Sequence, residues 1–137
     1  MRVMHFVTGG FSGATQVAVD LCLAARSAGM DVVLVLRRKR RTTLPAKVEA
    51  LRAQGLDVRV VPGWAHAATV WALRALALEW RPDILVAHGY SEHLWGRYAG
   101  LLARVPRLVH VEHNSRERYT RWRLKQALWL AVRTAAT

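Results

Sequence analysis

DVVLVL, residues 31–36, is one aspartate followed by five valine and leucine side chains. An apolar run without polar alternation is typical of a strand buried on both faces, as in a parallel sheet. Further strand-like runs occupy 2–8, 57–61, 83–88 and 107–111, and helical spacing marks 14–29, 44–54, 65–80, 91–104 and 118–134. This alternation predicts one α/β domain over residues 1–137: a Rossmann-like open parallel sheet of about five strands with helices on both faces. Right-handed crossovers give the strand order 3-2-1-4-5.

The composition indicates a single domain with a basic surface. The chain has 137 residues, 53% of them hydrophobic, and no apolar run reaches the roughly 18–20 residues that span a bilayer. The start is too short for a signal-peptide core, and the lone Cys22 is expected to be buried and inert, so we expect a cytoplasmic protein. The net charge of +12 favours anionic partners such as nucleic acid, phosphorylated sugars, nucleotides or an acidic membrane. An arginine-rich genome with a solvated basic face is the alternative.

Ligands of such sheets bind beyond the carboxyl ends of the strands, which here points to the loops at 8–14, 88–92 and 112–119. The first loop contains Gly9, Gly10, Ser12 and Gly13 before a helix, where free backbone N–H groups favour an anion. Phe11 stands where the dinucleotide fingerprint needs a glycine, and Arg37 and Arg38 replace the acid that would hold a ribose. The loop is therefore an anion-binding helix start or an ordinary tight turn.

Several histidines and tryptophans have plain structural interpretations. His88 with His93, and His110 with His113, resemble metal-ligand pairs, but zinc sites need three or four convergent ligands, so we expect no metal. His5, His66 and His110 are expected to be structural or surface histidines. The tryptophans of the middle of the chain are expected to pack rather than to serve as platforms: Trp64, Trp71, Trp80 and Trp95.

The stretch from His88 to Tyr119 resembles family 4 of the retaining GT-B glycosyltransferases, because Trp95-Gly96-Arg97, Pro106 and Glu112-His113-Asn114 stand in its spacing. The opening strand, the glycine loop and Val19-Asp20-Leu21 are similar too, although the family commonly has two adjacent glycines where this chain has Ser12-Gly13. The resemblance implies the acceptor-binding N-terminal half of an enzyme that transfers a sugar from a nucleotide-sugar to a sugar, polysaccharide or lipid-linked acceptor. It implies no cofactor, since the nucleotide-sugar is a co-substrate.

The same resemblance implies site residues. The glycine loop would approach the donor phosphates and the acceptor, and His113 would lie near the reacting sugar as the catalytic residue. The acceptor would be bound by His88, Tyr90, Glu92, Asn114, Arg116 and Tyr119. The leaving phosphate would help to deprotonate the acceptor, so the protein mainly positions groups and stabilises charge. A C-terminal donor-binding domain is absent from these residues, so the chain is expected to be inactive alone, as a fragment, a truncated frame or a subunit with a partner.

The basic segments allow two further interpretations. Trp122 and Trp129 lie in a basic segment that is predicted to be the last helix. Such a helix could contact the inner face of an anionic membrane, or the two tryptophans could form one stripe that packs against the sheet or another domain. The run from Arg37 to Arg41 could make the protein a non-catalytic module that binds nucleic acid or acidic lipid. No nucleic-acid motif is present, so nucleic acid is the less expected partner.

Overall fold

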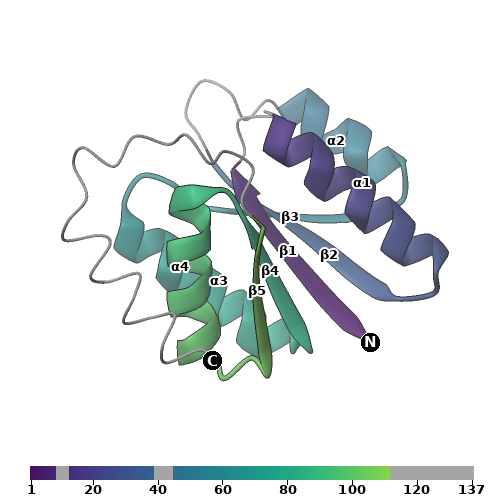
Figure 1. Ribbon diagram of the computed structural model, residues 1–137. Helices are drawn as coiled ribbons and strands as arrows, with labels where there is room; N and C mark the ends of the chain where they lie inside the picture. The colour runs from purple at the N-terminus through teal and green to yellow at the C-terminus, as the bar shows by residue number, and fades with distance from the viewer. Residues whose placement is uncertain (9–12, 39–44, 112–137) are drawn as a thin grey trace.

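The computed structural model describes residues 1–8, 13–38 and 45–111, which form a sheet between two helical layers (Figure 1). The elements in chain order are β1 (Arg2–Thr8), α1 (Gly13–Ser27), β2 (Asp31–Arg37), α2 (Pro45–Ala53), β3 (Asp57–Val61), α3 (His66–Trp80), β4 (Ile84–His88), α4 (Tyr90–Leu102) and β5 (Arg107–Val111). All strand pairs are parallel and the order is β3-β2-β1-β4-β5. The predicted fold class and strand order are confirmed. The helix predicted at 118–134 lies outside the described residues.

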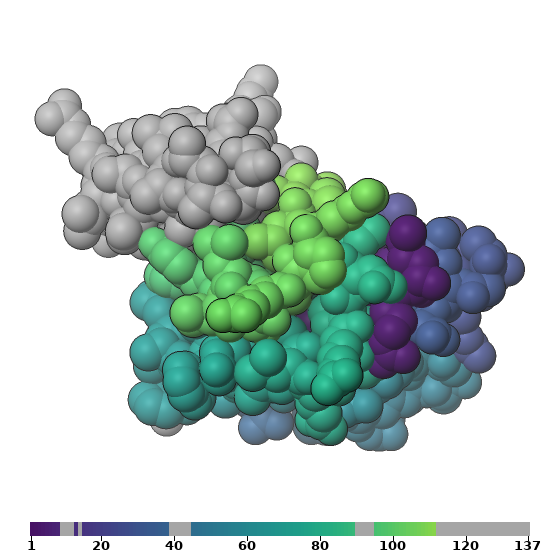
Figure 2. Space-filling model, turned by 90° about the horizontal axis from the view of Figure 1, so that it is seen from below, coloured from purple at the N-terminus to yellow at the C-terminus, as the bar shows by residue number. Residues whose placement is uncertain are grey.

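The core has two layers because alternate side chains of each strand point to opposite faces. On one face, Val7 and Leu34 pack against α1 and α2, in a cluster that includes Cys22 and Val48. On the other face, the core lies between the sheet and helices α3 and α4, and its members include Met4, Phe6, Val33, Leu73 and Ala99. Seen from below, the segment of α1 and β2 lies on one side and that of α4 and β5 on the other, with β1 and β4 between them (Figure 2).

The buried face of α1 differs from the predicted one. The apolar spacing of residues 14–29 predicts an inward face that includes Val17, Ala18 and Leu21; Ala18 is buried, but Val17 and Leu21 are exposed. The residues that do face the sheet are Thr15, Ala18, Val19 and Cys22. The hydroxyl of Thr15 donates to the carbonyl of Thr8 at 3.0 Å, and this bond fixes the rotation of the first turn. Cys22 is buried as expected, and burial raises the pKa of its thiol to about 12, so the thiol is inert.

Helix α4 lies close to the sheet because two glycines face it. A Cβ at Gly96 would lie 2.9 Å from the Cβ of Ala87, and one at Gly100 would collide with the side chain of Leu108. The apolar spacing of residues 91–104 also predicts that Leu102 is buried, but Leu102, the last residue of the helix, is exposed. The close packing fixes the start of α4 directly behind the end of β4.

Some helices end at a residue in the left-handed backbone conformation, and the sequence predicts such an end where that residue is a glycine. A glycine directly after a helical pattern, such as Gly29, predicts a left-handed cap, and the structure confirms it: Gly29 has a φ of 83° and its N–H donates to the carbonyl of Arg26 at 3.0 Å. Arg81 and Arg104 take the same left-handed conformation, with φ of 54° and 56°. No glycine marks these two turns, so the sequence pattern could not predict them.

Candidate functional site

The carboxyl ends of the strands meet at one edge of the sheet, as the parallel order requires. The last strand residues there are Thr8, Arg37, Val61, His88 and Val111. The N–H of Gly89 donates to the carbonyl of Val111 at 3.1 Å and so ties the exit of β4 to the end of β5. The loops after β1 and β4 therefore leave the sheet at the edge where they were predicted to form a site.

The predicted site residues are only partly within the described structure. Gly13 begins α1 and is exposed, whereas Gly9, Gly10 and Ser12 lie outside the described residues. Tyr90 is the first residue of α4 and Glu92 follows in its first turn, but nothing is described of their side chains. The predicted residues after β5 also lie outside the described residues: His113, Asn114, Arg116 and Tyr119. Their roles remain predictions.

His88 forms a buried pair with His5. Nδ1 of His5 and Nε2 of His88 are 2.9 Å apart, and the two ring centroids are 5.2 Å apart. Neither side chain reaches solvent to a significant extent, and burial lowers the pKa of His5 to about 4. His5 is therefore neutral at pH 7, and one imidazole donates a hydrogen bond to the other. The pair lies inside the sheet edge, and an acceptor contact by His88 stays a prediction.

His110 lies on the opposite face of the sheet from His88. In the β4–β5 register, His88 is paired with Val111 and His110 with Ala87, so His110 and His88 point away from each other. Nε2 of His110 donates to the carbonyl of Gly89 at 3.2 Å. This bond supports the turn between β4 and α4, where Gly89 has a φ of 89°. Within the described ranges, no group of three or more His, Cys, Asp or Glu side chains could hold a metal ion.

A cleft of about 1020 Å³ opens where β2 and β3 end. We call it the arginine cleft; the described residues that line it are Arg37, Arg38, Val60, Val61, Pro62, Gly63 and Trp64. The guanidinium of Arg37 lies 3.5 Å from the carbonyl of Gly63 and 3.4 Å from Nδ1 of His66. The N–H of Arg38 donates to the carbonyl of Val61 at 2.9 Å. Two cationic side chains thus border a concave surface at the edge where ligands of such sheets bind.

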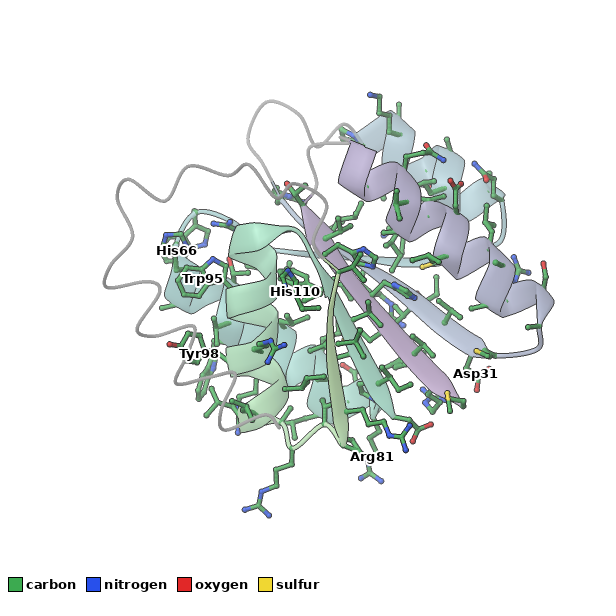
Figure 3. The ribbon with its side chains drawn as sticks, in the orientation of Figure 1. Asp31, His66, Arg81, Trp95, Tyr98 and His110 are labelled. Atoms are coloured by element: carbon green, nitrogen blue, oxygen red, sulfur yellow. The ribbon has the colours of Figure 1, made fainter. Side chains whose placement is uncertain are left out.

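A row of aromatic rings runs from the arginine cleft to α4. The rings of His66 and Trp95 are stacked with centroids 4.4 Å apart, and Tyr98 follows Trp95 at 6.2 Å (Figure 3). The indole N–H of Trp95 is buried and has no hydrogen-bond partner among the residues that the structure describes. His66, the first residue of α3, contacts both Arg37 and Trp95 of α4. Residues of α3 and α4 therefore support the wall of the cleft together.

Gly63, Trp64 and His66 were not predicted to be neighbours of Arg37. The sequence does contain the information for this contact. Pro62-Gly63 directly follows β3, and Arg37 and Arg38 stand at the end of β2 and just after it. Adjacent parallel strands bring their carboxyl ends together, so the two segments had to meet.

Substitution of Gly63 by alanine is expected to destabilise the fold by about 1–3 kcal/mol, the usual cost of overpacking. An added Cβ would collide with the carbonyl oxygen of Arg38, so backbone has to move. Gly13→Ala is the matched control, because its Cβ would meet nothing within 4 Å. Urea denaturation measures both. Equal midpoints for the two variants would contradict the close approach of Gly63 and Arg38.

The sequence profile described as Glycosyltransferase Family 4 matches residues 11–137. The chain belongs to this family. The match covers nearly the whole chain, including every element from α1 to β5. Among curated proteins, none matches the sequence.

Solved structures with the same fold include enzymes that are named for nucleotide-sugar substrates. A putative UDP-N-acetylglucosamine 2-epimerase from Listeria monocytogenes has a TM-score of 0.69 at 16% identity, over 99% of this chain and 37% of its own. The UDP-GlcNAc 2-epimerase from Neisseria meningitidis, bound to UDP-GlcNAc, gives 0.66 at 11% identity, over 96% and 38%. A glycosyltransferase from Streptomyces sp. SF2575 gives 0.56 at 15% identity, over 82% and 39%. At these identities the likeness shows the fold alone, and the chain spans less than two-fifths of each of these structures.

None of the helices within the described ranges combines the length and the hydropathy that a membrane crossing requires.

Proposed function

We propose that this family 4 chain is the acceptor-binding, N-terminal half of a retaining glycosyltransferase that uses a nucleotide-sugar donor. The observation that carries the proposal is the family match over residues 11–137 on a sheet of the expected strand order. The UDP-GlcNAc in the similar epimerase from Neisseria meningitidis supports a nucleotide-sugar as the donor. Transfer is tested by release of a nucleoside diphosphate, as set out in the Discussion.

The proposed roles follow the strand ends. The glycine loop after β1 would approach the donor phosphates, and His113, two residues beyond the end of β5, would lie near the reacting sugar. Arg37 and Arg38 would bind an anionic group of the acceptor in the arginine cleft, because guanidinium groups form strong, geometrically defined hydrogen bonds with phosphate and carboxylate oxygens. Through its contacts with Gly63 and His66, Arg37 is already oriented before a ligand enters.

Substitution of Arg37 by alanine is expected to weaken anion binding about 10-fold or more, since a hydrogen-bonded charge in a cleft contributes about 1.5–3 kcal/mol. Calorimetric titration of the full chain with inorganic pyrophosphate and with a hexose phosphate measures the effect. Arg26→Ala is the control, because Arg26 also donates to a backbone carbonyl, that of Gln54 at 3.1 Å, at the other end of α1 from the glycine loop. An equal loss in both variants would mean that only overall charge matters.

The alternative is a basic module that binds polyanions without catalysis, which the two arginines of the cleft also favour. Such a module would bind single-stranded nucleic acid more tightly than pyrophosphate, with affinity that falls steeply with salt. The same titrations, repeated with an oligonucleotide at two salt concentrations, separate the two functions.

A further inference from the structure

Several large apolar side chains are exposed on and just before helix α3. Trp64 stands two residues before the helix, and within the helix Trp71 and Leu78 are seven residues apart, which is two helical turns, so these two lie in one line. Their side chains are 84%, 62% and 44% exposed. The exposed alanines Ala67 and Ala75 fill the intervals. We call these five residues the α3 stripe.

The opposite face of the same helix already supplies the core. Thr69, Leu73 and Ala77 are buried against the sheet, and Val70 and Trp80 pack beside them. A surface helix normally pairs such a buried face with a polar outer face. Here the outer face carries the exposed Trp71 and Leu78 beside the polar His66 and Glu79, and packing within the described chain does not explain these apolar side chains.

Cationic groups flank the α3 stripe. The guanidinium of Arg74 lies over the ring of Trp71, 4.7 Å from its centroid, and the exposed Arg81 ends the helix (Figure 3). Glu79 is the only acid between residues 64 and 81. Tryptophan and leucine beside arginine are the side chains of helices that lie in the interface of an anionic bilayer.

We propose that the α3 stripe lies on the surface of an anionic lipid bilayer. The net charge of +12 favours a negatively charged surface and disfavours a second copy of this chain, which would bring two strongly cationic molecules together. The α3 stripe also begins at the carboxyl edge, where β3 ends, and runs to the opposite edge, where β4 begins. A domain docked over the carboxyl edge would therefore cover only one end of it. This inference does not depend on the proposed function.

The test is co-sedimentation of the full chain with vesicles of phosphatidylcholine alone and of equal parts phosphatidylcholine and phosphatidylglycerol. The chain is expected to bind the anionic vesicles, and Trp64→Ser with Trp71→Ser is expected to weaken partitioning about 10-fold or more. Leu21→Ser with Leu102→Ser is the matched control, because it removes two exposed leucines from α1 and α4 and is expected to bind normally. Circular dichroism confirms that each variant is folded.

A third variant distinguishes the α3 stripe from the segment at 118–134, for which the sequence predicts a basic helix. Trp122→Ser with Trp129→Ser is expected to keep at least half of the binding if the α3 stripe is the contact. The proposal is overturned if the chain ignores anionic vesicles, or if the Trp64 and Trp71 variant binds like the unmodified chain. It is also overturned if that variant instead converts a lipid-free dimer to a monomer in analytical ultracentrifugation.

Discussion

Acidification from pH 7 to pH 4 is expected to lower the free energy of unfolding by about 3 kcal/mol through His5 alone, because a pKa difference of one between the folded and unfolded chains corresponds to about 1.4 kcal/mol. Burial lowers the pKa of His5 from 6.5 to about 4, so the folded chain keeps this imidazole neutral while the unfolded chain protonates it. The stabilisation is fully present above pH 6.5. It is lost progressively as the pH falls from 6.5 to 4, because the unfolded state then binds a proton that the folded state does not.

Urea denaturation at four pH values between 4 and 7 measures this loss. His5→Gln removes the titrating group but keeps a side chain that can hydrogen-bond His88, so its stability is expected to fall less steeply with pH. The comparison is between slopes, which makes a general destabilisation of the variant irrelevant. His66→Gln, which changes an exposed histidine, serves as the control. Identical pH slopes for His5→Gln and the unmodified chain would contradict the buried pair.

The sheet could be predicted because its signals are local and repeated. The run at 31–36 became β2, the central strands are buried on both faces, and the order followed from the handedness of the crossovers. The rotation of α1 could not be predicted from its apolar pattern. Thr15 faces inward because its hydroxyl bonds to the end of β1, which is a tertiary contact that the alanine-rich helix does not reveal.

The edge of the sheet that carries the site was predictable, but the partners of individual side chains were not. His88 is fully buried against His5, a residue 83 positions away, and nothing in either local sequence marks that pairing. Trp64 and Trp71 were expected to pack, and that prediction was wrong, since both are largely exposed. Trp71 lies on the outward side of α3 because Leu73 and Ala77 occupy the inward side, and Trp64 stands before the helix begins.

The proposed catalytic role of His113 predicts a large loss of turnover. Replacement of a positioned histidine at a reacting centre typically lowers kcat by about 100-fold or more. His110→Ala is the matched control: His110 stands three residues earlier, in β5, and bonds to the turn at Gly89, so its replacement is expected to affect stability more than turnover.

Release of a nucleoside diphosphate from UDP-, GDP- and ADP-sugars, with product analysis for a transferred or an epimerised sugar, tests the proposed glycosyltransferase function. It is measured on the chain alone and together with a polypeptide that supplies a donor-binding domain. We expect release and transfer with retained configuration only in the combination, and loss of both in His113→Ala. Epimerisation without transfer, or no turnover together with tight, salt-sensitive binding of polyanions by the chain alone, would contradict the proposed function.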